Sequence, residues 1–165
     1  MSAGIALEGM RLVKDYLPRA YADPEDIEAR AQMMAAASMG ATAFQKGLGA
    51  IHALSHPLGA IYHTHHGTTN AVCMPAVLQF NKPAIAAKFE SVAAYLSISG
   101  GFGGFCDFVD AFNDALAIPK TLSGLGIISL DIDRVVAGEL QDPSTGGNPV
   151  EMTAENTKAL LHQIS

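Results

Sequence analysis

The sequence predicts an all-α domain, and three observations support this fold class. Alanine is abundant while β-branched residues are scattered, a composition that favours helix over strand. Apolar residues recur at helical spacings, and no stretch of useful length alternates apolar and polar residues as a half-buried strand does. Several candidate helices are preceded by an Asp or Thr that suits a helix N-cap. We therefore expect helices joined by short connections.

Length and composition limit the class of protein. The 165 residues suffice for one core, and we expect residues 1–165 to form a single helical domain. Hydrophobic residues make up 49% of the chain, which is too apolar for disorder, yet no apolar run is long enough to cross a bilayer. The net charge of −6 without a basic stripe argues against a nucleic-acid partner. We expect a soluble protein with no membrane partner, and a cytoplasmic one because the N-terminus lacks a signal-peptide pattern.

Two helices are expected before the glycines at 47 and 49. Residues 3–17 place apolar side chains three to five positions apart, and Pro18 is expected to end this helix. Asp23 followed by Pro24 combines an N-cap acid with a proline at the first turn, and acidic residues there suit the helix dipole. The second helix is therefore predicted from Pro24 to about Lys46.

The middle of the chain is predicted as shorter helices separated by prolines. A helix over 49–56 should be interrupted at Pro57, because a proline disfavours helical geometry in the residue before it. A short piece over 58–63 should follow, and then a helix over 68–80 with a kink at Pro75.

The next predicted helix opens at Pro83 and runs to about Ile98. The segment SGGFGGF, residues 99–105, is expected to be a flexible connection before a helix near 106–116. Its glycines do not indicate a phosphate loop, because no strand precedes them and no Lys-Ser/Thr pair follows.

Two helices complete the chain. Asp131 is expected to cap a helix that runs to Leu140, residues 142–149 should be loop, and Thr153 should cap the last helix, which runs to Ile164. The two cysteines, Cys73 and Cys106, form no C-x-x-C pair and lie in apolar helical patterns. We expect them to be small buried hydrophobes.

Five of the six histidines fall within one stretch of fifteen residues: His52, His56, His63, His65 and His66. Imidazole is the commonest protein ligand of mid-row divalent metals, and it titrates near neutral pH. His52 and His56 are four residues apart, so a helix places them on one face. His66 follows a helix break and a turn that can return it toward the other two.

Three interpretations of this cluster remain open on the residues alone: a metal site, a turn rich in exposed histidines, and an acid–base site without metal. No Asp or Glu occurs between Glu28 and Glu90. A carboxylate ligand would therefore come from a distant segment or from outside this chain.

The segment GLGAIHALSHPLGAIYHTHHGTTNAVCMPAVLQFN resembles the signature of the iron-containing (group III) alcohol dehydrogenases. The helix pair before it and the ending DPSTGGNPVEMTAENTKALL are similar to the same family, so the resemblance covers nearly the whole chain. It implies a multi-helix C-terminal domain of the dehydroquinate synthase-like or iron-containing alcohol dehydrogenase type. The family's catalytic metal is usually iron and sometimes zinc, so the implied cofactor is Fe²⁺ or Zn²⁺.

The resemblance also implies roles for individual histidines. The family's metal ligands are one Asp and three His, and two of these His fall on His52 and His66. The residue at the His-Pro-Leu-Gly position, His56, is implied to be a catalytic residue near the substrate and the cofactor ring. His63 and His65 occupy positions where the family varies, at the pocket mouth or on the solvated surface.

The chain departs from the family in what it lacks. The other Asp and His ligands would lie before Met1, and the N-terminal α/β nucleotide-binding domain with its glycine-rich turn has no counterpart here. We therefore assign no cofactor-binding residues and expect a partial, weak metal site, with NAD(P) bound only in the complete enzyme.

The expected function is that of the C-terminal domain of a metal-dependent, NAD(P)-linked alcohol dehydrogenase, inactive alone, whose complete form acts on a small alcohol or aldehyde. The alternatives are a non-catalytic helical module that forms homo-oligomers or complements a separate nucleotide-binding chain, a maleylacetate reductase-like fragment, and a small metal-binding protein. Homo-oligomerisation is expected because a face left bare by a missing domain needs cover.

Overall fold

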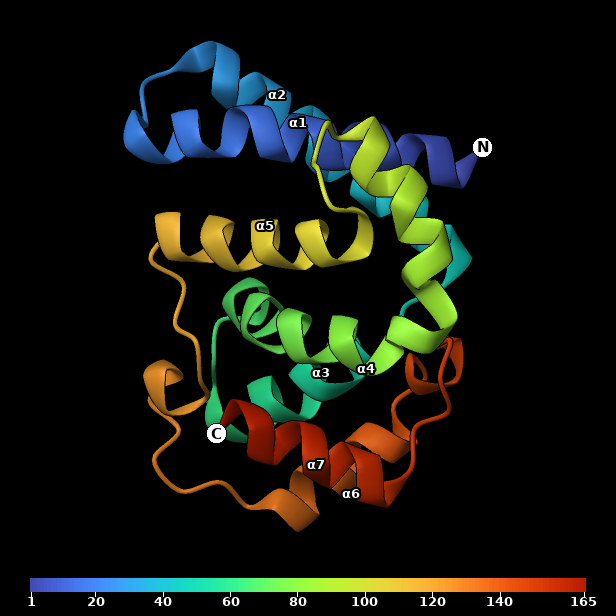
Figure 1. Ribbon diagram of the computed structural model, residues 1–165. Helices are drawn as coiled ribbons and strands as arrows, with labels where there is room; N and C mark the ends of the chain where they lie inside the picture. The colour runs from blue at the N-terminus through green and yellow to red at the C-terminus, as the bar shows by residue number, and fades with distance from the viewer. The chain divides into compact units, whose positions relative to one another are not determined.

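The computed structural model describes all residues 1–165 and contains helices but no strand (Figure 1). The all-α prediction is confirmed. None of the helices is both long enough and apolar enough to span a membrane. The α-helices are α1 (Ser2–Ala22), α2 (Ile27–Ala43), α3 (Ala50–Tyr62), α4 (His66–Tyr95), α5 (Gly101–Ala115), α6 (Ile132–Gln141) and α7 (Ala154–Ile164). Short 3₁₀ turns lie at η1 (Phe44–Lys46), η2 (Ser123–Leu125) and η3 (Thr145–Gly147).

The chain divides into two compact units. The first unit consists of Met1–Gly47 and Lys88–Phe105, and the second of Leu48–Ala87 and Cys106–Ser165. In the first unit α1 and α2 run antiparallel, side by side (Figure 1). The second unit contains all five clustered histidines, so it is the unit that carries the candidate site.

The boundary between α1 and α2 differs from the prediction in two ways. Pro18 lies inside α1, which continues to Ala22, because the last turn is held by packing against α2 and by ion pairs from Arg19. The N-cap of α2 is Asp26, whose side chain accepts a hydrogen bond from the N–H of Ala29. Asp23 instead accepts from the N–H of Glu25 and forms the turn between the helices. The predictions for both boundaries were therefore wrong by about one turn.

The prolines of the middle segment also lie within helices. α3 continues through Pro57 to Tyr62, and α4 is one helix that contains Pro75 and Pro83. The predicted break at 57 and the two separate helices at 68–80 and 83–98 were wrong. A proline in a helix interior costs roughly 3 kcal/mol. Here burial offsets that cost, because Pro57 and its neighbour Leu58 are buried in the second unit.

Residues 101–105 are the first turn of α5, so the prediction that all of 99–105 would be a flexible connection was wrong. Gly100 and Gly101 both have positive φ, at 87° and 58°, which lets the chain enter the helix sharply. The carboxylate of Glu90 accepts a hydrogen bond from the N–H of Phe102 at 3.3 Å and so caps the new helix. Phe102 is buried and its ring meets Phe89 edge-on, which anchors this turn.

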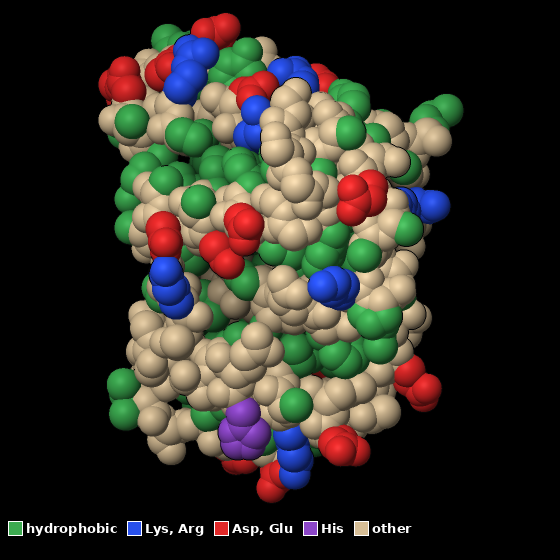
Figure 2. Space-filling model, in the orientation of Figure 1, with side chains coloured by type: hydrophobic (Ala, Val, Ile, Leu, Met, Phe, Trp, Pro, Cys, Tyr) green, Lys and Arg blue, Asp and Glu red, His purple; other side chains and the backbone are tan.

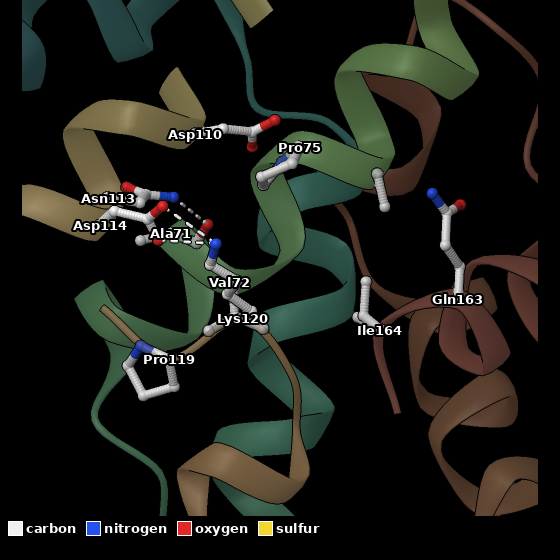
Figure 3. Close-up of a pocket in the computed structure, with 11 residues that line it drawn as sticks. Ala71, Val72, Pro75, Asp110, Asn113, Asp114, Pro119, Lys120, Gln163 and Ile164 are labelled. Atoms are coloured by element: carbon white, nitrogen blue, oxygen red, sulfur yellow. Dashed lines mark hydrogen bonds and ion pairs between the residues drawn. The ribbon is translucent and has the colours of Figure 1, made fainter. Parts of the chain in front are cut away.

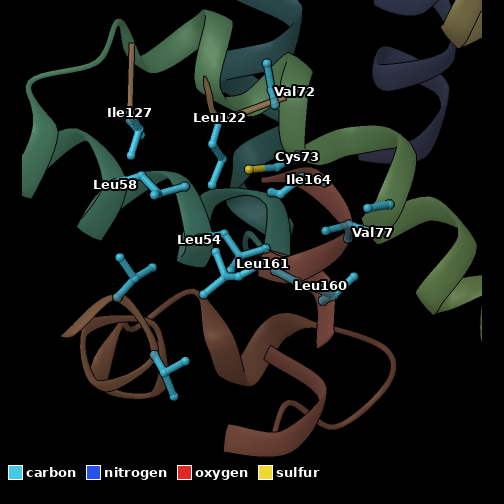
Figure 4. Packing of buried hydrophobic residues seen from close by; sticks show 14 of the residues in the cluster. Leu54, Leu58, Val72, Cys73, Val77, Leu122, Ile127, Leu160, Leu161 and Ile164 are labelled. Atoms are coloured by element: carbon cyan, nitrogen blue, oxygen red, sulfur yellow. The ribbon is translucent and has the colours of Figure 1, made fainter. Parts of the chain in front are cut away.

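The core of the second unit joins α3, α4 and α7 (Figure 4). Leu54 and Leu58 of α3 are fully buried, and they pack in a cluster with Cys73 of α4 and Leu161 of α7. The other labelled members are Val72, Val77, Leu122, Ile127, Leu160 and Ile164. Both cysteines are free and buried, as predicted. The predicted caps of α6 and α7 are also confirmed, since Asp131 and Thr153 each accept a backbone N–H of the following turn.

A close approach between α3 and α6 occurs at Gly138. A Cβ placed on this glycine would lie 2.7 Å from the Cβ of Pro57, closer than real carbon atoms approach. The two helices therefore pack at a distance that only glycine allows at this position.

We predict that Gly138→Ala lowers the stability of the chain. Alanine favours helix over glycine by about 0.8–1.0 kcal/mol, but the clash with Pro57 should outweigh that gain, for a net loss of roughly 1–3 kcal/mol. The matched control is Gly40→Ala in α2, where a Cβ meets nothing within 4 Å and where we expect a gain. Urea unfolding followed by circular dichroism measures both changes, and an unchanged or raised midpoint for Gly138→Ala would contradict the packing.

A buried carboxyl group lies between α6 and α7. The side chain of Glu139 is fully buried and accepts hydrogen bonds from the hydroxyls of Thr157 at 3.0 Å and Thr145 at 3.2 Å. Burial raises the pKa of Glu139, although the two hydroxyls act in the opposite direction. The folded protein therefore holds the protonated form more readily than the unfolded chain does.

We predict that Glu139→Gln stabilises the chain near neutral pH. A carboxyl whose pKa is raised by folding contributes stability at low pH and loses that contribution as pH rises through its folded pKa. Glutamine does not titrate, so its advantage in melting temperature should grow from about pH 4 to about pH 8. Thermal melts across that range test this, with the exposed Glu151→Gln as the control. An advantage that is equal at both ends of the range would contradict the assignment.

Candidate metal centre

Three imidazole rings converge in the second unit. The ring centroids of His52 and His66 are 5.3 Å apart, those of His56 and His66 are 5.5 Å apart with the rings stacked, and those of His52 and His56 are 5.8 Å apart. His52 and His56 lie one turn apart on α3, and His66 is the first residue of α4. The chain reversal between α3 and α4 therefore brings together the three histidines that the sequence singled out.

The reversal depends on a short turn with its own hydrogen bonds. His63 ends α3 in the left-handed conformation, with φ 57°, and its N–H donates to the carbonyl of Gly59 at 2.9 Å. The hydroxyl of buried Thr69 donates to Thr64 Oγ1 at 2.8 Å, which ties the first turn of α4 to this connection. The turn thus fixes where His66 stands relative to α3.

The side chain of Asn70 joins His52 and His66. Its Nδ2 lies 3.4 Å from His52 Nε2 and 3.1 Å from His66 Nε2, so both nitrogens face the same amide group. Two ligand atoms that each bind one tetrahedral zinc at about 2.0–2.1 Å lie about 3.4 Å from one another. Each imidazole nitrogen is therefore about as far from Asn70 Nδ2 as two neighbouring ligand atoms of one metal ion are from each other.

The other end of the Asn70 amide has no partner. Its Oδ1 is buried and makes no hydrogen bond within the protein. Buried polar atoms are almost always paired, and an exception indicates a missing water, ion or ligand. An ion or a bound water beside Asn70 Oδ1 would supply that partner.

Neighbouring groups indicate which ring nitrogens carry the protons. Buried Ser55 donates its hydroxyl to the carbonyl of His52 at 3.2 Å, and its Oγ lies 3.5 Å from His66 Nδ1. This arrangement assigns the His66 proton to Nδ1 and leaves a lone pair on Nε2, since the Asn70 amino group also donates there. Burial lowers the pKa of His52, and the neighbouring His66 and His56 lower it further. His52 is therefore neutral at neutral pH, as a metal ligand must be.

His56 makes a close contact that the sequence did not reveal. Its Nδ1 lies 2.7 Å from Asp142 Oδ2, a carboxylate 86 positions later in the chain. Asp142 directly follows α6. No sequence signal joins these residues, because their contact depends on how α6 packs against α3. Asn70 could have been found by its spacing, since it lies four residues after His66 on a helix.

The remaining clustered histidines lie on the surface. His63 and His65 are both exposed. His65 Nδ1 accepts a hydrogen bond from the N–H of Thr68 at 3.3 Å, which caps the start of α4. The structure thus gives His65 a part in helix capping.

The residues present fit one part of a metal site. No group of three or more His, Cys, Asp or Glu side chains is arranged to hold a metal ion by itself. His52 and His66 offer two converging nitrogens, and catalytic zinc sites commonly use three protein ligands. The two imidazoles thus supply only part of a ligand set, and a complete metal site needs further ligands from other groups.

A separate pocket of about 250 Å³ lies in the same unit (Figure 3). It is lined by residues of α4, α5 and the segment after α5, together with the end of α7. Two of its charged groups, Lys120 and Asp114, pair with one another at 2.9 Å, and Asn113 donates to the carbonyl of Ala71. This pocket contains no histidine, so the chemistry of the clustered imidazoles lies outside it.

Charged side chains are scattered over the face of the molecule shown in Figure 2. Acidic and basic groups lie singly or beside one another, with apolar side chains between them. Several of the ion pairs join neighbouring turns of one helix, such as Glu8 with Arg11 and Arg11 with Asp15. Exposed pairs of this kind contribute little to stability.

Comparison with known proteins relates this arrangement to one family. The family model described as Fe-containing alcohol dehydrogenase family, C-terminal, matches residues 1–165. A 4-hydroxybutyrate dehydrogenase of Cupriavidus necator is 39% identical over 97% of this chain and 44% of its own length. An NAD-dependent methanol dehydrogenase of Bacillus methanolicus is 32% identical over 94% of this chain and 43% of its own length. The chain thus spans less than half the length of these relatives.

Solved structures show the same fold. A 1,3-propanediol oxidoreductase superposes with a TM-score of 0.93 at 27% identity, covering 99% of this chain and 45% of that protein. A maleylacetate reductase from a Rhizobium strain superposes with a TM-score of 0.80 at 26% identity, with the same coverage.

We predict that Asn70→Asp strengthens binding of Zn²⁺ at least tenfold. A carboxylate oxygen at the position of Nδ2 would lie beside both imidazole nitrogens and add a charged third ligand, and tenfold corresponds to about 1.4 kcal/mol. The control is Gln163→Glu, which adds the same charge at an exposed position of α7. Calorimetric titration with Zn²⁺ measures the change. Equal strengthening by both variants would mean that net charge alone is responsible and that the three groups do not share a site.

Proposed function

The chain belongs to the Fe-containing alcohol dehydrogenase family, and from this membership we propose that it contributes part of the catalytic metal site of an NAD(P)-linked alcohol dehydrogenase. The observation that carries the proposal is the convergence of His52 Nε2 and His66 Nε2 on the amide of Asn70. Neither the surface capping histidines nor the pocket of Figure 3 offers such an arrangement.

His52 and His66 would hold the metal ion, Fe²⁺ or Zn²⁺, through their Nε2 atoms. When bound, such an ion polarises an alcohol oxygen and lowers its pKa. His56 stands beside both ligands, so it is placed to orient the substrate or to relay the proton that the hydroxyl releases. Ser55, whose Oγ lies beside His66 Nδ1, keeps the Nε2 lone pair of His66 directed at the site.

The rest of the site would come from groups beyond residues 1–165. Two imidazoles fall short of the three or four protein ligands of a complete site, and a carboxylate among the missing ones would add the charge that two neutral rings lack. The nicotinamide nucleotide would likewise bind elsewhere, with hydride passing between it and the substrate carbon. On this proposal the 165-residue chain alone does not catalyse hydride transfer.

The proposed substrate class is small primary alcohols and the corresponding aldehydes. Support comes from the names of the relatives, which act on 4-hydroxybutyrate and methanol, and from the structural neighbour named for 1,3-propanediol. These substrates share a hydroxyl group on a short chain. A reductase of the maleylacetate type is the second candidate, supported by the similarity to one such structure.

Association with another chain or domain is also part of the proposal. The first unit exposes several large apolar side chains, among them Ile27 at 80%, Met34 at 73% and Tyr21 at 57% of their surface. Exposed apolar side chains of this size are often covered at an interaction site. A second copy of this chain or a nucleotide-binding domain would cover them.

We predict that His52→Ala and His66→Ala each weaken binding of Zn²⁺ or Fe²⁺ at least tenfold, and that the double variant abolishes it. His56→Ala should retain binding, since His56 is paired with Asp142 and is not a proposed ligand. His162→Ala, at an exposed position in the last turn of α7, is the control. Titration of the purified chain, monitored by metal analysis after dialysis, gives the readout.

The outcomes separate the candidate functions. Loss of binding in the His52 and His66 variants alone supports the ligand assignment. Equal binding by the double variant and the wild-type chain would overturn it and would favour a non-catalytic helical module. Stoichiometric metal that survives chelation in the wild-type chain would mean that this chain contains a complete site, contrary to the proposal of missing ligands.

A further inference from the structure

Asp142 occupies an unusual position for a carboxylate. It follows the C-terminal end of α6, where the helix dipole disfavours negative charge, and its side chain is only 11% exposed. A group kept charged at such a place needs compensating hydrogen bonds. Its Oδ1 accepts from the N–H of Ser144 at 2.8 Å, and its Oδ2 faces His56 Nδ1 at 2.7 Å.

The balance of these effects keeps Asp142 ionised. Burial alone would raise its pKa, but the hydrogen bonds from Ser144 and His56 outweigh burial, and the pKa lies below its ordinary value. An ionised carboxylate has acceptors and no donor. The short contact therefore requires the proton to be on His56 Nδ1.

The α3–α6 packing explains how a residue so distant in sequence reaches His56. Pro57 follows His56, and Gly138 precedes Asp142 by four residues, one turn along α6. The close approach of Pro57 and Gly138 brings the end of α6 against this part of α3. The carboxylate and the imidazole are thus held by two packed helices rather than by a flexible loop.

We propose that Asp142 is a positioning residue that fixes the tautomer and the orientation of the His56 imidazole. With its proton held on Nδ1, His56 presents a lone pair at Nε2. The Asp142–Nδ1 contact also fixes the ring plane, which stacks on His66 with an angle of 13° between the rings. A free neutral imidazole lacks this preference, because either nitrogen can carry the proton.

This inference deepens the proposed function and rests on it for its chemical consequence. In that reaction His56 Nε2 accepts the proton released by the substrate hydroxyl, so Nε2–H forms while Nδ1–H stays bonded to Asp142. The negative carboxylate stabilises the resulting imidazolium, and the Nε2 proton then passes to solvent. In the reverse direction the same atom returns a proton to the carbonyl oxygen. Asp142 itself neither gains nor loses a proton.

The test is the tautomer of His56 in the ¹⁵N-labelled chain. Long-range ¹H–¹⁵N correlation spectra, recorded at a pH where the imidazoles are neutral, distinguish Nδ1–H from Nε2–H. We expect the Nδ1–H form in the wild-type chain and a shift toward Nε2–H in Asp142→Ala. The control is Asp133→Ala, which removes an exposed carboxylate from α6 and should leave the His56 tautomer unchanged.

For the wild-type chain and the Asp142→Ala variant, two results would overturn the proposal. One is a wild-type His56 that carries its proton on Nε2. The other is an Asp142→Ala chain that keeps its fold and the wild-type tautomer. If Asp142→Ala does not fold, Asp142→Asn replaces it, because the amide keeps the shape of the side chain. An amide oxygen accepts less strongly than a carboxylate, so the Nδ1–H population should fall, and an unchanged population would overturn the proposal.

This experiment is independent of metal binding. A tautomer shift in Asp142→Ala, found in a chain that binds no metal, would support the positioning role of Asp142. It would also mean that this role has no part in the proposed metal-dependent reaction. Metal binding lost in the His52 and His66 variants, together with an unchanged His56 tautomer in the Asp142 variants, would support the metal site and refute the positioning role.

Discussion

The burial of one face of α3 is the constraint on which the candidate site depends. Leu54 and Leu58 are fully buried and share a core with residues of α4 and α7. On a helix, the residues between them and beside them must point elsewhere. His52 and His56, two positions before each leucine, therefore lie on a different face of α3. The same apolar contacts that hold the second unit together place the imidazoles at its polar edge.

Proline and glycine have complementary roles in this packing. Pro57 lies within α3, where it removes one backbone hydrogen bond, and its ring faces Gly138 of α6 at the closest point between the helices. A side chain on α6 at that point would push the helices apart. The distance between α3 and α6 also determines whether Asp142 reaches His56. The close packing of Pro57 against Gly138 therefore contributes to the core and also brings Asp142 within reach of His56.

The polar groups around the imidazoles differ in how completely they are hydrogen-bonded. Ser55, Asp142 and Thr69 each have well-defined partners, and they orient the imidazoles and the turn that carries His66. Asn70 is the exception, with one end of its amide between two ring nitrogens and the other end buried without a partner. A buried polar atom of this kind is stabilised when another atom forms a hydrogen bond with it or binds it. The unpaired oxygen thus belongs to the same side chain that joins the two imidazoles, while the other polar groups beside them are already paired.

The sequence by itself determined the helical class, the free buried cysteines, the caps at Asp131 and Thr153, and the clustering of the histidines. These features depend on local patterns: composition, spacing along a helix, and the side chain that starts it. Tertiary structure decided the rest. Prolines at 18, 57, 75 and 83 lie inside helices although sequence rules count each as a local penalty, and at Pro57 burial offsets that penalty. The contact of Asp142 with His56 spans 86 positions and arises only when α6 packs on α3, so no local pattern could contain it.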